Sequence, residues 1–140
     1  MKFIGKLLSK NSYNNKTTTA VSIGALGEEA AVKALKKQGY KILERNYRTK
    51  TGEIDIIAKD KEYTCFVEVK LRTSNDFGLP ADFINEAKQQ KIIKTAQLYA
   101  VRNHIYNAPM RFDAVLINAE VKGEGLINAK IDVVKDAFRM

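Results

Sequence analysis

The sequence predicts an α/β fold in which a mixed β-sheet is flanked by helices, and three observations support this. Apolar residues recur at three- and four-residue steps in two segments, residues 19–39 and 81–102, as they do on one face of an amphipathic helix. Between these segments, three runs of alternating apolar and polar residues are separated by very short links, which only antiparallel strands tolerate. A long helical link leads to a fourth run, which makes the third and fourth strands parallel.

The first half of the chain is expected to form a helix and then a three-stranded meander. The helix begins at about Thr19, its apolar face includes Leu26, Ala31 and Leu35, and Gly39 is a natural C-terminal cap. The strands are the runs YKILERNYR at 40–48, GEIDIIAKD at 52–60 and YTCFVEVKLR at 63–72.

The second half is expected to form another helix and one or two returning strands. The loop segment Asp76-Phe77-Gly78 is either a lid over a site or a plain turn, and the helix then runs from about Ala81 to Arg102. Its core-facing residues are Ile84, Ile92, Ala96, Tyr99 and Ala100. The run MRFDAVLINAE at 110–120 is the fourth strand, and GLINAKIDVVKDAF at 125–138 is a weaker fifth.

Size and charge limit the class of protein. A chain of 140 residues suits one domain, and we expect residues 1–18 to be a basic, disordered tail and residues 19–140 to form the domain. Twenty-four Lys and Arg against 16 Asp and Glu give a formal net charge of +8, which favours a nucleic-acid partner. Four lysines of the tail supply half of this excess, so the tail is either a solubilising segment or an arm that touches DNA.

Other absences in the sequence narrow the location and the kind of site. No apolar run approaches the roughly 20 residues of a membrane helix, and no signal peptide is recognisable, so we expect a cytoplasmic protein without a membrane partner. A single cysteine and a single histidine exclude an internal disulfide and a structural zinc site. Cys65 is expected to be a buried thiol, and Asp113 to pair with Arg111 or cap its strand.

The charged residues of the second and third strands are the main candidates for chemistry. Side chains alternate along a strand, so Glu68 and Lys70 share the face of Phe66, opposite the apolar face of Cys65. If the hairpin turns at residues 61 and 62, paired residue numbers sum to 123. This register sets Asp55 directly opposite Glu68, and Glu53 opposite Lys70.

Two opposed carboxylates suit a divalent cation. They repel each other unless an ion such as Mg²⁺ or Mn²⁺ lies between them, and Mg²⁺ takes one or two carboxylates together with waters and phosphate oxygens. Lys70 would then orient the attacking water or stabilise charge on the phosphate, which outlines a site for phosphodiester hydrolysis. The alternative is an exposed charged face, with surface pairs Glu53–Lys70 and Asp55–Arg72.

The motifs taken together resemble a known family. The segments GALGEEAAVKALKKQGYKILERNYR, GEIDIIAKD, FVEVKLR, DFG and RFD occur in this order and closely resemble the YraN family of small bacterial proteins. That family is assigned to the restriction-endonuclease-like superfamily, whose signature is a PD-(D/E)xK site. The resemblance implies an αβββαβ core similar to that of archaeal Holliday-junction resolvases.

The same resemblance implies roles for four residues. The metal-binding aspartate falls on Asp55, and the acid and lysine of the ExK element fall on Glu68 and Lys70. The glutamate of the first helix, which often completes the site in this superfamily, falls on Glu28. From the residues alone, Glu28 lies at the edge of the apolar helix face and is equally compatible with a surface position. The proline of the signature is absent here, because Ile54 precedes Asp55.

Basic residues near these positions are candidates for DNA phosphate contacts, although a solvated surface is the alternative. They are Arg45, Arg48, Arg72, Lys88 and Lys91.

The expected function is a Mg²⁺- or Mn²⁺-dependent DNA endonuclease acting on branched or structured DNA. The alternatives are an inactive DNA-binding or adaptor module on the same fold and a protein-interaction scaffold. A homodimer is left open, because a resolvase-like reaction calls for two symmetric sites.

Overall fold

A computed structural model describes residues 22–73 and 84–140 of the chain. Three expectations lie outside these residues: the disordered tail at 1–18, the helix start at Thr19, and the lid or turn at Asp76-Phe77-Gly78. In the described part, neither helix is long and apolar enough to cross a membrane.

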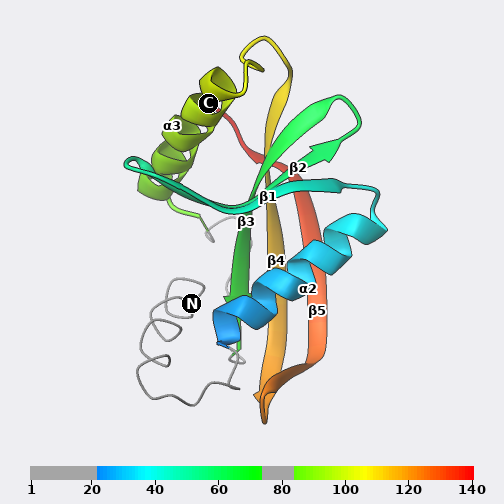
Figure 1. Cartoon of the computed structure of the whole chain (residues 1–140). Helices are drawn as coiled ribbons and strands as arrows, with labels where there is room; N and C mark the ends of the chain where they lie inside the picture. Colours follow the sequence, from blue (N-terminus) through cyan, green and yellow to red (C-terminus); the bar gives the residue numbers. More distant parts are fainter. Residues whose placement is uncertain (1–21, 74–83) are drawn as a thin grey trace.

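Over the described residues the fold is α/β, with a five-stranded mixed sheet between two helices, as the sequence predicts and as a restriction-endonuclease-like core would have (Figure 1). The strands lie side by side in chain order, from β1 to β5. The elements are α2 (Ile23–Lys37), β1 (Lys41–Thr49), β2 (Gly52–Asp60), β3 (Tyr63–Arg72), α3 (Glu86–Arg102), β4 (Met110–Lys122) and β5 (Gly125–Phe138).

The predicted strand directions are confirmed. The strands β1, β2 and β3 form an antiparallel meander, β3 and β4 are parallel, and β5 returns antiparallel to β4. Between β2 and β3 the paired residue numbers sum to 123, from Asp60–Tyr63 to Ile56–Val67, which is the predicted register.

Capping residues set the described helix ends. The hydroxyl of Ser22 accepts from the backbone of Ala25 at the start of α2, and Gly39 follows the end of this helix with a φ of 94°. The start of α3 is a correction to the predicted start at Ala81. The side chain of Asn85 accepts a hydrogen bond from the backbone of Lys88, which fixes the first helical residue at Glu86.

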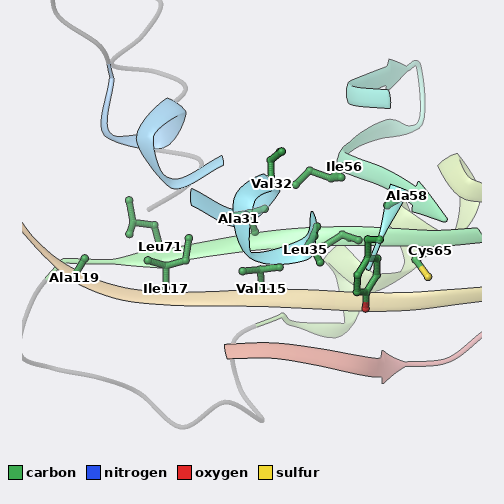
Figure 2. Close-up of a cluster of buried hydrophobic side chains, with 13 residues drawn as sticks. Ala31, Val32, Leu35, Ile56, Ala58, Cys65, Leu71, Val115, Ile117 and Ala119 are labelled. Carbon is green, nitrogen blue, oxygen red and sulfur yellow. The ribbon is translucent and has the colours of Figure 1, made fainter. Parts of the chain in front are cut away.

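The two helices cover opposite faces of the sheet, because alternate residues of β3 contact different helices. Leu35 of α2 packs in one cluster with Cys65, Val67 and the rest of the predicted apolar face (Figure 2). Phe66, on the other face, packs with Tyr99 and other residues of α3. All five residues predicted for the core side of the second helix are buried. The strand β3 is thus buried on both faces, as is usual for a strand between helices.

The strands β2 and β3 separate at one end, and we call this place the fork. Their regular pairing ends at Ile56–Val67, whereas β2 stays paired with β1 as far as Gly52 and β3 stays paired with β4 as far as Arg72. The hairpin tip packs on α3, since the hydroxyls of Thr51 and Thr95 are 2.8 Å apart. Figure 1 shows the β1–β2 hairpin reaching toward α3 while β3 continues beside β4. The fork comprises residues 53–55 of β2 and 68–70 of β3.

A buried polar network lies at the opposite end of β2. Arg111 donates to Asp60 at 2.7 Å and to both carboxylate oxygens of Asp113 at 2.8 Å, so the predicted pairing of Asp113 with Arg111 is confirmed. The hydroxyl of Tyr40 donates to Asp113 at 2.8 Å. The hydrogen bond from Arg111 holds the pKa of Asp60 below its usual range, and burial raises the pKa of Cys65 to about 12. Arg111 thus links Asp60 of β2 to Asp113 of β4. Cys65 is the buried thiol that was expected.

Candidate functional site

Asp55 is fully buried at the fork, one residue beyond the last regular pair of β2 with β3. Its Oδ2 accepts a hydrogen bond of 2.8 Å from the backbone N–H of Val69. By the register of the hairpin, this N–H faces the position of Ile54 on β2. Where the two strands separate, the carboxylate of Asp55 therefore accepts the hydrogen bond from Val69 that a backbone carbonyl of β2 would accept in a continuous ladder.

Glu68 is also buried, with 3% of its surface exposed, and it lies on the α3 face of the sheet together with Phe66. Its Oε2 is 2.6 Å from the Nζ of Lys88, which is in the first turn of α3. The alternative of an exposed charged face is wrong for both Asp55 and Glu68, because the two helices cover the sheet on both sides.

The predicted direct pairs at the fork need a correction. The register is right, but the regular strand pairing ends one residue before Asp55 and Glu68. These two residues are therefore adjacent in register but lie beyond the ladder of backbone pairs. The regular pairing also ends before Glu53 and Lys70, and the carboxylate of Glu53 lies 3.5 Å from Arg48. The hairpin bends toward α3 here, which separates the strands. Lys70 is half-buried on the same face as Glu68, two residues further along β3.

Glu28 approaches the fork from the other side of the sheet. It is 7% exposed and belongs to α2, whereas Lys88 reaches Glu68 from α3. Its Oε1 accepts a hydrogen bond of 3.2 Å from Asn46 Nδ2. In β1, Asn46 lies between the partners of Ile54 and Ile56, which places it beside Asp55. Glu28 is therefore a boundary residue tied to the strand position next to Asp55, and the surface alternative is wrong.

The candidate phosphate-binding residues divide into two groups. Arg45 and Arg48 extend from β1, where they are exposed and lie 3.2 Å from Glu29 and 3.5 Å from Glu53. The other three are Arg72 at the end of β3, and Lys88 and Lys91 of α3. Of these, Lys91 is exposed and Arg72 is partly exposed, whereas Lys88 contacts the buried acid of the fork.

The acids of the fork fit a hydrated divalent ion better than a site made of protein ligands alone. Within residues 22–73 and 84–140, no three His, Cys, Asp or Glu side chains gather as metal ligands. Mg²⁺ needs only one or two carboxylates, with waters and phosphate oxygens as the other ligands. Asp55 and Glu68 supply two buried carboxylates, and the ammonium of Lys88 at 2.6 Å from Glu68 shows that a cation can lie against this acid.

Two contacts of the site are not predicted from the sequence. The sequence indicates Lys88 only as a phosphate contact, although it contacts Glu68, and it gives no indication that Asn46 contacts Glu28. A signal for the first was present, because Asn85 is a typical N-cap and places Lys88 in the first turn of α3. Asn46 has a φ of 54°, a conformation that Asn adopts more readily than most residues.

Comparisons with known proteins show a protein family for this chain. The sequence model of the uncharacterised protein family UPF0102 matches residues 27–117, which include all the acids of the fork. A UPF0102 protein of Acetivibrio thermocellus is 44% identical over 126 residues, or 89% of this chain and 94% of that protein. UPF0102 proteins of Clostridium botulinum and Caldanaerobacter subterraneus are 45% and 42% identical over 84% and 88% of this chain, and over 94% and 99% of their own lengths.

Proposed function

The chain belongs to the UPF0102 (YraN) family, and we propose from the geometry of its fork that it is a metal-dependent DNA endonuclease. The observation that carries this proposal is the burial of Asp55 and Glu68 where β2 and β3 part, with a cationic group against Glu68. Buried acids are costly unless they are paired or coordinate a metal, and they are therefore candidates for function.

Each residue of the fork has a role in this proposal. Asp55 and Glu68 would hold Mg²⁺ or Mn²⁺, which would supply a Lewis acid that polarises the phosphate and lowers the pKa of a bound water. Lys70 lies two residues beyond Glu68 on the same face, where it orients the attacking water and stabilises the charge that develops on the phosphate oxygens. Glu28 acts as a positioning residue, because it holds Asn46 beside Asp55.

The substrate class follows from charge. The net charge of +8 and the cations Arg45, Arg48, Arg72, Lys88 and Lys91 support contacts with the phosphate backbone. Backbone contacts carry no sequence information, so a preference would come from DNA shape. We therefore propose branched or otherwise structured DNA as the substrate.

The test is cleavage of forked, flapped and four-way DNA in the presence of Mg²⁺ or Mn²⁺. Replacing the ligand in Glu68→Gln, or the water-orienting group in Lys70→Met, should lower the cleavage rate by at least about 100-fold. Glu62→Gln and Lys94→Met are matched controls, because both residues are exposed and Glu62 lies at the opposite end of β2 from the fork, and they should cleave like the wild type. Equal activity in Glu68→Gln and the wild type would exclude the mechanism.

One observation favours a second candidate, a DNA-binding or adaptor module without hydrolysis. The ammonium of Lys88 already neutralises Glu68, as it would in a site that had lost its metal. The two candidates differ in heat denaturation, because an ion that binds only the folded chain raises its Tm. DNA binding without cleavage, and with no rise of the Tm in Mg²⁺ or Mn²⁺, would support the module.

A further inference from the structure

Lys88 lies where the two proposed roles of the fork conflict. Its ammonium is 2.6 Å from Oε2 of Glu68, which is the carboxylate proposed to hold a divalent ion. A carboxylate oxygen in contact with an ammonium group is not available to a second cation in the same direction. Binding of an ion at this oxygen therefore requires that Lys88 move.

The two partners differ in their freedom to move. Glu68 is 3% exposed in the middle of β3, and its backbone is paired with β4, so the acid is held in place. The side chain of Lys88 is 36% exposed, and its head is carried on a flexible four-carbon stem. Rotation of this stem moves the ammonium from the acid into water without a change of the sheet.

The backbone of Lys88 is held at the start of α3, whereas its side chain is partly exposed to solvent. Its N–H donates to the Oδ1 of Asn85 at 2.8 Å, so the residue occupies the first turn of α3. The next lysine on this helix, Lys91, is exposed and provides a matched comparison. The helix α3 therefore fixes the position of the Lys88 backbone, and the long side chain of Lys88 brings its ammonium to Glu68.

We propose that Lys88 is a displaceable counter-ion: it occupies the cation position of Glu68 in the metal-free protein and leaves it when a divalent ion binds. The inference rests on the proposed metal site, but it does not require that DNA be cut. Lys88 places a positive charge against a buried acid in the absence of metal, and such a charge stabilises a carboxylate that burial would otherwise disfavour. The same contact weakens metal binding, because it must be broken first.

Isothermal titration calorimetry of wild type and variants with Mn²⁺ alone tests the competition. Loss of the ion pair removes the cation that competes for Oε2 of Glu68, so Lys88→Met should bind Mn²⁺ about tenfold more tightly than the wild type. Its Tm without metal should be lower, and its rise on adding Mn²⁺ larger. Lys88→Arg, which keeps a cation, and Lys91→Met should bind like the wild type. An unchanged or weaker affinity of Lys88→Met would overturn the proposal.

A second measurement needs no variant and remains decisive if Lys88→Met does not fold. Acetic anhydride labels lysines according to their accessibility, and mass spectrometry resolves each site. In the wild type, labelling of Lys88 should rise when Mn²⁺ is added, whereas labelling of Lys91 should stay constant. Constant labelling of both lysines with metal bound would overturn the proposal.

The outcomes separate this inference from the nuclease function. Tighter Mn²⁺ binding in Lys88→Met without DNA cleavage by the wild type supports the counter-ion and contradicts the endonuclease. Cleavage by the wild type with equal Mn²⁺ affinity in both proteins supports the endonuclease and contradicts the counter-ion. Absence of Mn²⁺ binding in both proteins contradicts both.

Discussion

The side chain of Asp55 has one property that supports the fold, its hydrogen-bond acceptor, and another that the proposed chemistry needs, its negative charge. The fold needs an acceptor for the N–H of Val69, whereas a metal site needs a negative charge. Asn offers the acceptor without the charge, and Ala offers neither. Substitutions at this residue therefore separate stability from metal binding.

We predict that Asp55→Asn keeps its free energy of unfolding within about 1 kcal/mol of the wild type, whereas Asp55→Ala loses about 1–3 kcal/mol, because a buried N–H is left without its acceptor. Both variants should lose Mn²⁺ binding. Urea denaturation and calorimetry measure the two effects. Equal stability of the Asn and Ala variants would show that the hydrogen bond to Val69 does not support the fork.

Asp60 links the buried network to acid stability. The hydrogen bond from Arg111 lowers the pKa of Asp60 in the folded chain below its unfolded value of about 3.9. A carboxyl whose pKa is lowered by folding stabilises the protein above the unfolded pKa, and this contribution is lost as the pH falls through the folded pKa.

We predict that Asp60→Asn lowers the free energy of unfolding at neutral pH by about 1–3 kcal/mol, because Arg111 loses a charged acceptor. The difference from the wild type should shrink as the pH falls below about 4, where the wild-type carboxyl takes up its proton. Urea denaturation at a series of pH values gives both curves. A constant difference across this range would contradict the assignment of the acid-sensitive contact to Asp60.

At the scale of the element, the first turn of α3 positions Lys88 at the fork. The Asn85 cap accepts from the Lys88 N–H, so one side chain sets both the helix start and the residue that contacts Glu68. The cap also explains why the helix begins after Ile84, which is buried but precedes the helix.

We predict that Asn85→Ala lowers the free energy of unfolding by about 1 kcal/mol, because the N–H of Lys88 loses its acceptor. Asn85→Ser, which still offers an oxygen to this N–H, should stay closer to the wild type. Urea denaturation compares the three proteins. Identical stability of the Ala and Ser variants would show that the cap is not what fixes the start of α3.

For the whole molecule, the distribution of charge predicts how DNA binding responds to salt. The logarithm of the affinity should fall linearly with the logarithm of the salt concentration, by about 0.9 per neutralised phosphate. Deleting residues 1–18 removes four lysines, so the slope should become shallower by at most about 3.6. Binding should persist, because the candidate cations lie between Arg45 and Lys91. Fluorescence anisotropy of labelled DNA measures both proteins, and complete loss of binding on deletion would place the DNA contact in the tail.

The bounds of the strands were largely determined by the sequence itself. The predicted runs at 52–60, 63–72 and 125–138 coincide with β2, β3 and β5, because alternation with a period of two is a local property of the chain. The register of β2 with β3 was equally accessible, because a short turn at Lys61 leaves one alignment that keeps the apolar face together.

The tertiary structure alone decided what the charged residues contact. Lys88 is twenty positions from Glu68 in the sequence, and their contact depends on where α3 begins and on the face it covers. Asp55 is buried because helices cover both faces of the sheet. The pairing of β2 with β3 ends beside it because the hairpin bends toward α3. Local patterns fix the secondary structure, but contacts between elements depend on packing, which no short stretch of sequence encodes.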